Sequence, residues 1–526
     1  MLTYKKTVDD VIILMLGIVI FVHLKWFNKD KNISNLPLQK GVQWVTSYDS
    51  FMTSSFNVSK APKSHEEIAA VLARVEEDGA TVTIRGSGFS FGGHSLPPVD
   101  TDRIHYILST SLLKEIKCIH TLKHEVILEV GAGVTWEEAI RHANSACGLA
   151  SHQRAIPYSA PTARSITISG SIAAHTHSRT TIGTGGYAHE HVSKFTLITP
   201  RNEYECYLLK SLRFTPDICT AAVGSFGRLG VINQLYLHLK IIDEKVCVES
   251  KVLFTSCDMK ALTTEYVKVA VNDTKYDFGI SAVFHSRRGQ GYVFGSHFTT
   301  CEETTVFRNV FPGFDGPTLY NKIIYALGHW IGSNIHSKFL TSTFYEGRIG
   351  FSDAEKNTFF QDTHDSSRTL MTYFTTSPPL PIVHQSWFIS GDNISRVLQF
   401  IQLMHKAMNE ESYSQLQELF ELGDTLRIPA SHIPTHPSYH YGVGHIYTVT
   451  FAVHTELDYN IAKQFCWDIS SRSSGSAIPL LLKGIEAPSV ILRDAHSEML
   501  EFVEKFANGE DPAGILDSMF WRKISP

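Results

Sequence analysis

Glycine-rich turns beside short β-rich runs constrain the fold of this chain more than any other feature. The first, Arg85–Ser95, reads RGSGFSFGGHS and follows the β-rich run Thr81–Ile84. Because glycine allows backbone conformations that side chains forbid, such a turn can aim several amide N–H groups at one concavity, where a diphosphate fits. The turn matches neither GxGxxG nor a Walker loop, so taken alone it favours a structural role.

Two more turns of this kind follow along the chain. Residues Ile166–Ala174 read ITISGSIAA and lead through His175–Ser178 to a Gly183–Gly186 turn, and Gly224–Ile232 reads GSFGRLGVI. The recurrence of such turns between strands indicates one extended ligand contacted by several loops.

Hydrophobic spacing predicts mixed helices and strands around these turns. The predicted helices are 65–77, 136 to about 146 and about 394–408, and the predicted strands are 81–84, 192–199 and the aromatic-rich 292–298. Pro378–Pro381 marks a break in the second half.

The size and composition predict a two-lobed small-molecule enzyme. The chain has 526 residues, 43% of them hydrophobic, which exceeds the usual size of one domain. A net charge of −5 gives no basic surface of the kind that binds nucleic acid. The cysteines show no CxxC pair or clustering, so we predict mostly buried thiols rather than a zinc site or a disulfide framework. They are Cys118, Cys147, Cys206, Cys219, Cys247, Cys257, Cys301 and Cys466.

Residues 8–28 form a predicted membrane anchor helix. Val11–Val22 contains no polar residue, and Lys25–Phe27 gives it an edge typical of a headgroup region. A cleaved signal peptide is the rival interpretation, but no small-residue cleavage site follows. The lysines after the run favour a cytosolic body, while the membrane, endomembrane or mitochondrial, stays open. Sequons matter only if the body faces a lumen, and they lie at Asn32, Asn57, Asn272 and Asn393.

In these turns the chain resembles the vanillyl-alcohol-oxidase-type flavoproteins, whose FAD domain is called PCMH-type. Their first loop, RGxGHS, is matched by Arg85–Ser90, their second, GxxxxGTHGSG, by Gly170–Ser178, and their third, GxGxxG[IV][IV], loosely by Gly224–Ile232. The resemblance implies an α+β fold. Its parts are a two-subdomain PCMH-type FAD-binding domain over 40–240, an α+β substrate-binding cap domain with a large antiparallel sheet over 241–485, and a C-terminal segment, 486–526, that returns to the FAD domain.

The resemblance also implies which residues contact FAD. They are Arg85, Gly86, Ser87, Gly88, Phe89, Ser90, His94, Ser95, Thr167, Gly170, Ser171, Ala174, Thr176, His177, Val231 and Ile232. Many relatives have a histidine that bonds covalently to the flavin where this chain has Phe89. Phenylalanine cannot form that bond, so non-covalent FAD is expected, with His94 as the less favoured alternative attachment point.

Later segments resemble the aldonolactone oxidase and alditol oxidase branch, which includes D-arabinono-1,4-lactone oxidase. The pair Thr176–His177 fits it, as does Asp511–Asp517 for the DPxGxFxN ending. The E-I-R segment is matched by Thr425–Arg427 without its glutamate, and P-H-W-[GA]-K only by Pro479–Lys483, where Leu481 and its neighbour replace His-Trp. Part of the branch's catalytic set is therefore missing.

The resemblance assigns the catalytic cations to Arg427 and Lys483. Hydride transfer from an alcohol carbon leaves negative charge on the pyrimidine side of the flavin, which a fixed cation stabilises. An ordinary ion pair is the alternative role for each side chain. The proton acceptor is assigned only as His432, His436 or water. The pair His175 and His177 has no third ligand at usual spacing, so no metal is expected.

Three functions follow from these observations. The first is an oxidoreductase acting on the CH–OH group of a sugar-derived lactone or polyol, with oxygen, a quinone or a cytochrome as electron acceptor. The second is cytokinin-dehydrogenase-like amine oxidation, which the absence of Asp and Glu from residues 151–189 disfavours. The third is a flavin-binding or flavin-free scaffold without catalysis, consistent with Phe89, Thr425 and Leu481. Nucleic acid is not an expected partner, and the membrane is one through the anchor helix.

Overall fold

The computed structural model describes most of the chain outside its N-terminus and a segment near its middle. The described residues are 43–46, 52–99, 103–157, 166–177, 186–208, 217–243, 246–272, 280–285, 290–300, 356–357, 382–416, 420–453, 455–473, 475–482 and 487–524. Among them, no helix combines the length and the apolar character needed to cross a membrane. The anchor predicted at 8–28, the sequon at Asn32, Lys483 and the Pro378–Pro381 break lie outside these residues.

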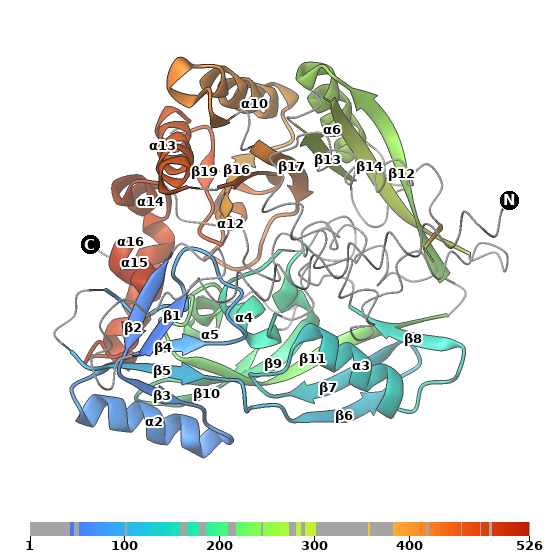
Figure 1. Ribbon diagram of the computed structural model, residues 1–526. Coiled ribbons are helices and arrows are strands. Elements are labelled where there is room, and N and C mark those ends of the chain that lie inside the picture. Colours follow the sequence, from blue (N-terminus) through green and yellow to red (C-terminus); the bar gives the residue numbers. More distant parts are fainter. Residues whose placement is uncertain are drawn as a thin grey trace, which may run out of the picture.

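The described residues form two lobes, an N-terminal lobe and a cap lobe, which lie one above the other in Figure 1. The N-terminal lobe comprises residues 52–243 together with 487–524, and the cap lobe comprises residues 246–482. Each has its own hydrophobic core, and a smaller cluster of buried side chains from both lobes joins them.

A small parallel sheet opens the N-terminal lobe. Its strand order is β3-β5-β4, and α2 packs on β4. The helix begins at a Ser64 cap and buries Ile68, Leu72 and Val75, as its spacing predicts. The elements are β3 (Val58–Lys60), α2 (His65–Glu77), β4 (Thr81–Arg85) and β5 (His105–Ser109), preceded by the β1 (Gln43–Thr46) and β2 (Thr53–Phe56) hairpin.

A larger antiparallel sheet completes the N-terminal lobe. It runs β10-β9-β11-β7-β6, and β8 also pairs with β11. Its buried face packs on α3, α4, α5 and the C-terminal helices. The elements are β6 (Ile116–Thr121), β7 (Glu125–Val130), α3 (Trp136–Ala146), β8 (Gln153–Ile156), α4 (Ile168–Ala173), η2 (Ala188–His191), β9 (Val192–Ile198), β10 (Glu203–Tyr207), α5 (Ile218–Ala222) and β11 (Val231–Asp243).

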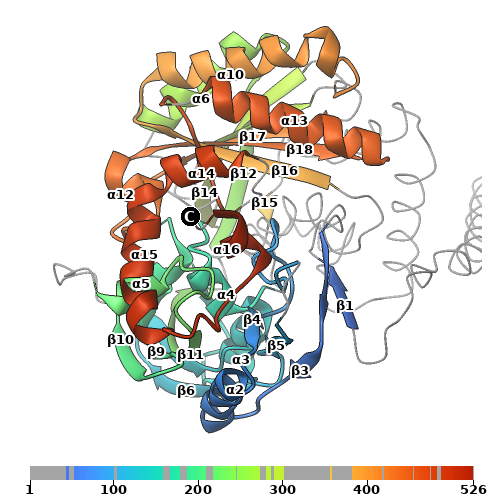
Figure 2. The ribbon, with the colours of Figure 1, turned by 90° about the vertical axis from the view of Figure 1, so that its left-hand side faces the viewer.

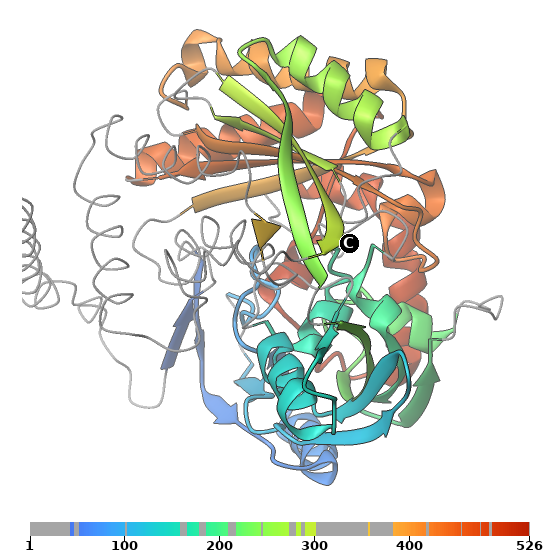
Figure 3. The same cartoon turned by 90° about the vertical axis from the view of Figure 1, so that its right-hand side faces the viewer.

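An eight-stranded antiparallel sheet forms the cap lobe, in the order β15-β12-β14-β13-β17-β18-β16-β19. Helices α6, α10 and α13 cover its outer face, away from the N-terminal lobe, and Figure 3 shows the long pair β12 and β14 from the side. The elements are β12 (Val246–Ser256), α6 (Met259–Asn272), β13 (Ile280–His285), β14 (Gln290–Thr300), β15 (Lys356–Asn357), β16 (Ile382–Ser390), α10 (Ile394–Met408), η5 (Glu411–Tyr413), β17 (Phe420–Ile428), α12 (Pro437–Tyr441), β18 (Gly444–Ala452), α13 (Glu456–Arg472) and β19 (Ile478–Pro479).

The C-terminal segment returns to the small parallel sheet. Leu516 makes a parallel bridge to Val82 of β4, and the amide of Asp517 donates to the Val82 carbonyl at 3.1 Å. Asp511 accepts the amides of Ile515 and Leu516 and pairs with Arg228 at 2.8 Å. The helices here are α14 (Ser489–Ala495), α15 (Ser497–Glu510) and α16 (Met519–Ile524), visible in Figure 2.

Most predicted elements are confirmed at nearly the predicted bounds. The helices α2 and α3 and the cap helix α10 match, and the strands predicted at 81–84, 192–199 and 292–298 lie within or overlap β4, β9 and β14.

The prediction that the cysteines are mostly buried thiols is wrong. Cys118 and Cys147 form one disulfide across 29 residues, and Cys206 and Cys219 form another across 13. The strand-to-helix topology, which spacing in the sequence does not reveal, brings each pair to a Cα separation of 5.6 or 5.3 Å, within the range of a disulfide. Of the other described cysteines, Cys257 is exposed and Cys466 is buried, and neither belongs to a disulfide.

Candidate functional site

The first glycine-rich loop leaves the C-terminal end of β4. Gly88, Gly92 and Gly93 all have positive φ, between 65° and 81°, where a side chain would be strained. Among the described residues, the backbone amides of Ser87, Gly88 and Ser90 donate to no acceptor. Several unengaged N–H groups in a short loop are what an anionic diphosphate needs as ligands.

Arg85 holds the two ends of this loop together. Its Nη1 atom donates to the carbonyl and to the hydroxyl of Ser95, both at 3.2 Å, and the Ser90 and Ser95 hydroxyls lie 2.6 Å apart. A Cβ on Gly88 would lie 2.6 Å from Nη2 of the same guanidinium, so this position has no room for a side chain. Burial lowers the pKa of Arg85, yet a guanidinium stays charged in proteins, and its charge favours an anion here.

The second loop meets the first at Thr167. A Cβ on Gly86 would lie 2.5 Å from Thr167 Oγ1, and a Cβ on Gly170 would lie 2.7 Å from the same atom. The Thr167 amide also donates to the Ser87 hydroxyl at 3.3 Å. The two glycines therefore let the backbone of both loops lie against the Thr167 side chain, where any side chain on either glycine would clash.

The residues after Thr167 form α4 and the turn that follows it. Ser171 is fully buried, accepts the indole N–H of Trp136 at 3.0 Å and donates to the Thr167 carbonyl, so its hydroxyl is engaged within the fold. Ala174 ends the helix, and the amide of Thr176 donates to the Ser171 carbonyl. His177 is buried and pairs with Tyr187 as an isolated bridge.

The third turn packs against the second. The amide of Gly224 donates to the Ile172 carbonyl at 3.1 Å, and that of Phe226 donates to the Ala173 carbonyl at 2.8 Å. The side chains of Val231 and Ile232 are buried in two hydrophobic clusters of the N-terminal lobe. These two predicted contact residues could reach a ligand only through their backbone.

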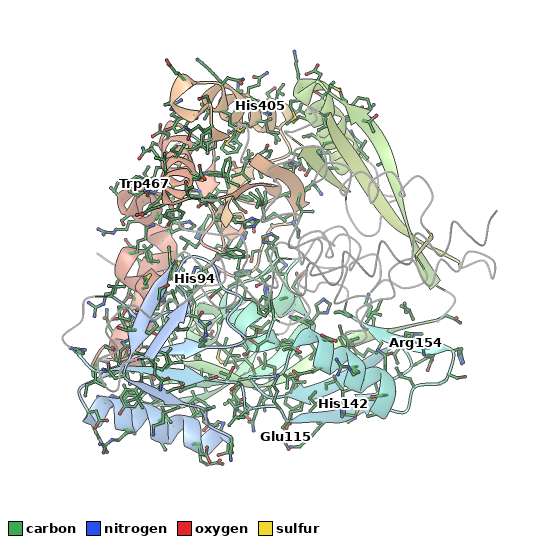
Figure 4. The ribbon with its side chains drawn as sticks, in the orientation of Figure 1. His94, Glu115, His142, Arg154, His405 and Trp467 are labelled. Carbon is green, nitrogen blue, oxygen red and sulfur yellow. A yellow bond between two sulfur atoms is a disulfide. The ribbon has the colours of Figure 1, made fainter. Side chains whose placement is uncertain are left out.

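His94 lies beneath the first loop, not on its surface. Its ring stacks on Phe226 with centroids 4.4 Å apart and tilts against Phe520 at 4.3 Å, so the first loop, the third turn and α16 meet at this histidine, which Figure 4 labels. Burial lowers its pKa to about 4. Nearby, Trp521 donates its indole N–H to the Ser225 carbonyl at 3.1 Å.

The seam between the lobes is built around His175, which follows α4 with φ 49°. Its Nδ1 atom lies 3.1 Å from Thr435 Oγ1 and its Nε2 atom 3.2 Å from Ser431 Oγ, both in the cap. Tyr187 donates to the Pro429 carbonyl at 2.9 Å. Burial, reinforced by neighbouring histidines, holds the pKa of His175 well below its usual value.

One face of the cap sheet is turned toward the first loop. On β16, His384, Ser386 and Phe388 alternate onto this face, since the residues between them pack against the cap helices. The His384 ring stacks on Phe91 of the first loop at 5.0 Å, and Phe388 joins the cluster that contains Tyr187 of the N-terminal lobe. The sequence prediction missed His384 because only strand register places it opposite the loop.

Hydroxyl groups from β18 extend this face into a polar row. His384 Nδ1 lies 2.8 Å from the Thr450 hydroxyl, and the hydroxyls of Ser386 and Thr448 lie 2.7 Å apart. All four side chains are buried and none is a carboxylate or an ammonium. The row offers uncharged hydrogen-bond donors and acceptors next to the glycine-rich loop.

Arg427 is not part of this face. The neighbouring Leu426 and Ile428 pack with Tyr187 on the inner side, so alternation along β17 puts Arg427 and Thr425 on the helix-covered side. There Arg427 makes two bonds of 2.7 Å to Asp392. Hydrogen bonding and charge from Arg427 hold the pKa of Asp392 far below its usual range. The structure thus places Arg427 in an ion pair away from the other predicted site residues.

The other candidate residues also differ in whether they lie near the site. His432 is exposed, whereas His436 is buried at the seam, bonded through Nδ1 to the Ser438 hydroxyl at 2.8 Å, and burial lowers its pKa to about 3. Tyr439 is exposed on α12 and Tyr447 faces the cap helices. Phe89 is partly buried within the first loop.

Buried Thr110 is a further residue beside the first loop. Its amide donates to the Arg85 carbonyl at 3.0 Å, while its hydroxyl is buried without a hydrogen-bond partner in the described part of the chain. A buried polar atom in that state costs free energy unless a ligand or water meets it. The unengaged amides of the first loop, the absence of a side chain at Gly86 and the Thr110 hydroxyl together fit a dinucleotide cofactor.

Comparison with known proteins agrees with this geometry. Residues 58–205 match the family model described as FAD binding domain, a span that holds the first and second loops. No curated protein has a sequence similar to this chain. The resemblance expected from the loops is thereby confirmed at the level of the domain: residues 58–205 match an FAD-binding domain of the PCMH type, and such a domain indicates an FAD-dependent oxidoreductase.

Proposed function

We propose that this oxidoreductase removes a hydride from the CH–OH carbon of a sugar-derived lactone or polyol, with FAD held non-covalently and with oxygen, a quinone or a cytochrome as the electron acceptor. The observation that carries the proposal is the uncharged polar row of the cap sheet, which lies opposite the FAD loop where His384 stacks on Phe91. A polyhydroxylated substrate is neutral and needs many hydrogen bonds, and hydroxyl and imidazole groups supply them without a charge to desolvate.

The chain's own groups have distinct roles in this proposal. The amides of Ser87, Gly88 and Ser90, with the Arg85 guanidinium, bind the diphosphate, and bound FAD supplies the hydride acceptor. Thr448 and Thr450 orient substrate hydroxyls. His384 accepts the hydroxyl proton as the hydride leaves, a role that the sequence alone left to His432, His436 or water.

Non-covalent attachment rests on two side chains. Phe89 cannot bond to the flavin, and the ring of His94 is packed between Phe226 and Phe520, behind the loop. The test is acid precipitation of the purified protein: yellow flavin in the supernatant supports the proposal, while colour that stays with the pellet contradicts it.

Arg427 favours a second candidate function, a flavin-binding scaffold without turnover. Its ion pair with Asp392, on the far face of the sheet, leaves the expected cation away from the loops. Amine oxidation gains no such support. The first acidic residue after the stretch 151–189 is Glu190, whose carboxylate accepts the Tyr187 amide as a helix cap.

Anaerobic spectra separate these functions. The full chain, purified in detergent, is mixed with a panel of aldonolactones, polyols and amines, and the visible flavin band is recorded. Bleaching by a lactone or polyol supports the proposed reaction and bleaching by an amine supports amine oxidation. A flavin band that no compound bleaches while dithionite does supports the scaffold.

We also propose that residues 8–28 anchor the enzyme to a membrane as a single helix. Alkaline carbonate extraction of membranes tests this. The chain should stay in the membrane pellet, and a variant lacking residues 1–28 should move to the supernatant; a full chain found in the supernatant contradicts the anchor.

A further inference from the structure

Two disulfides crosslink the N-terminal lobe. Cys118 of β6 is bonded to Cys147 at the end of α3, and Cys206 of β10 is bonded to Cys219 of α5. Each bond therefore ties a sheet strand to a helix packed on the same core. Disulfides of this structural kind form and persist in oxidising compartments and are rare in the cytosol.

A metal site is the competing interpretation of one pair. Cys118, His142 and Cys147 place a ligand atom each within 4.8 Å of one another, and Figure 4 labels His142 on α3. The sulfur atoms are bonded to each other, however, and a disulfide has no thiolate to give a metal. The second pair, Cys206 and Cys219, belongs to no such group among the described residues. Oxidation accounts for both pairs, whereas a metal accounts for one.

Sequons give an independent indication of the compartment. Asn57, Asn272 and Asn393 each begin an Asn-x-Ser/Thr triplet, and all three side chains are exposed. Asn272 uses its amide nitrogen, which donates to the Lys268 carbonyl at 2.9 Å. A glycan is attached through this nitrogen, so the other two are the better acceptors.

The two better acceptors are held in a suitable orientation. Asn57 Oδ1 accepts the His105 amide at 2.8 Å, and Asn393 Oδ1 accepts the Ser395 amide at 2.9 Å as the cap of α10. In both, the oxygen is turned to the protein while the nitrogen donates to no described residue. Asn57 lies on the N-terminal lobe and Asn393 on the cap, so the two acceptors lie on different lobes.

We propose that the body of this enzyme folds in the lumen of the secretory pathway, where it acquires both disulfides and carries N-linked glycans on Asn57 and Asn393. If residues 8–28 span the membrane, the chain then enters with its N-terminus in the cytosol. This is the reverse of the cytosolic body that the lysines after the apolar run favour. The disulfides outweigh the bias in lysine distribution because they form and persist where the compartment is oxidising.

Glycosylation is tested on the full chain expressed in eukaryotic cells. Ser59→Ala and Ser395→Ala remove the third residue of each triplet while they keep Asn57 and Asn393 in their structural hydrogen bonds. Each alanine variant should migrate faster than the wild type by the shift that one glycan causes. Peptide-N-glycosidase should remove the same shift from the wild type. The matched controls Ser59→Thr and Ser395→Thr keep the triplets and should migrate as the wild type does. A mobility that neither serine-to-alanine variant changes would overturn the proposal.

The disulfides are tested by alkylation in denaturant with a chelator present, followed by mass spectrometry. Cys118, Cys147, Cys206 and Cys219 should resist alkylation until a reductant is added, while Cys257 and Cys466 react at once. Alkylation of all four without reductant would overturn the oxidised compartment. Zinc released together with free thiols at Cys118 and Cys147 would overturn it in favour of the metal site.

Discussion

The FAD loops and the cap sheet both contribute groups to the candidate site, but different features of the sequence place those groups there. The loops depend on missing side chains: Gly86 and Gly170 contact Thr167 so closely that a Cβ would overlap its hydroxyl. The cap depends on the alternation of side chains along β16. Gln385 and Trp387 face the helices, and His384 therefore faces the loop. A glycine pattern can be recognised in a sequence, whereas the face of a strand reverses with a shift of one residue.

The largest expected effect concerns three buried histidines: His94 beneath the FAD loop, His436 at the seam, and His496, whose Nε2 atom lies 2.7 Å from the Pro479 carbonyl of the cap. Burial lowers the folded-state pKa of His94 and His496 to about 4 and of His436 to about 3. The unfolded chain, with pKa values near 6.5, therefore binds protons first as the pH falls. Stability is flat above pH 7, and between pH 7 and 5 the free energy of unfolding should drop by about 2 kcal/mol per histidine, about 6 kcal/mol for three.

Urea unfolding at pH 7 and pH 5 measures this drop. His436→Gln should reduce it by about 2 kcal/mol, since one protonation site is gone. Equal stability at the two pH values would mean that these histidines are not buried neutral groups and that water reaches them.

The next effect separates the two faces of the cap sheet. His384→Ala should lower kcat by about a hundredfold, the usual contribution of a general base, with flavin content unchanged. The matched control is Arg427→Met on the opposite face of the same sheet, which should leave kcat within a factor of about two because Arg427 touches neither loop nor row. A larger kcat loss in the control than in His384→Ala would reverse our assignment of the faces.

The glycine contacts have a smaller expected effect. In Gly86→Ala the new methyl group must displace Thr167 Oγ1 from 2.5 Å, which separates the two loops. We expect FAD affinity to fall about tenfold, or about 1.4 kcal/mol. Flavin fluorescence titration of the apoprotein measures it. Gly509→Ala, where a Cβ meets nothing within 4 Å, is the control and should bind FAD as the wild type does.

The smallest effect is the stability cost of breaking the Arg427 ion pair. Arg427→Met leaves Asp392, whose side chain is 30% exposed, without its bidentate partner. Because water still reaches this carboxylate, we expect a loss of only about 1 kcal/mol in the free energy of unfolding. Thermal unfolding at neutral pH measures the loss, and a loss of several kcal/mol would show that the pair is more buried than its exposure indicates.

The sequence predicts the N-terminal lobe well because its determinants are local. Periodicity locates α2 and α3, and the glycines locate the three turns that converge. The run ITISGSIAA, rich in β-branched residues, nevertheless contains the helix α4, since Ile168 and Ile172 are buried in the core one turn apart.

The cap and the cysteines could not be predicted in this way. Arg427 matches a motif, but its function depends on which side of β17 it occupies, and that depends on long-range pairing with β13 and β18. Cys118 and Cys147 are likewise far apart in sequence and adjacent only after folding. Both failures concern contacts that no local pattern encodes.

The docking of the C-terminus has a consequence for biosynthesis. Thr83 of β4 donates to the Asp517 carbonyl across 434 residues, and Met519 and Phe520 pack under the FAD loop at Gly93 and His94. At 5–20 residues per second, a ribosome needs roughly 20 to 90 s to make the intervening chain. The loop emerges early but lacks its support until α16 has been made, so the nascent domain stays incomplete until then, and cofactor loading becomes a step that follows the synthesis of α16.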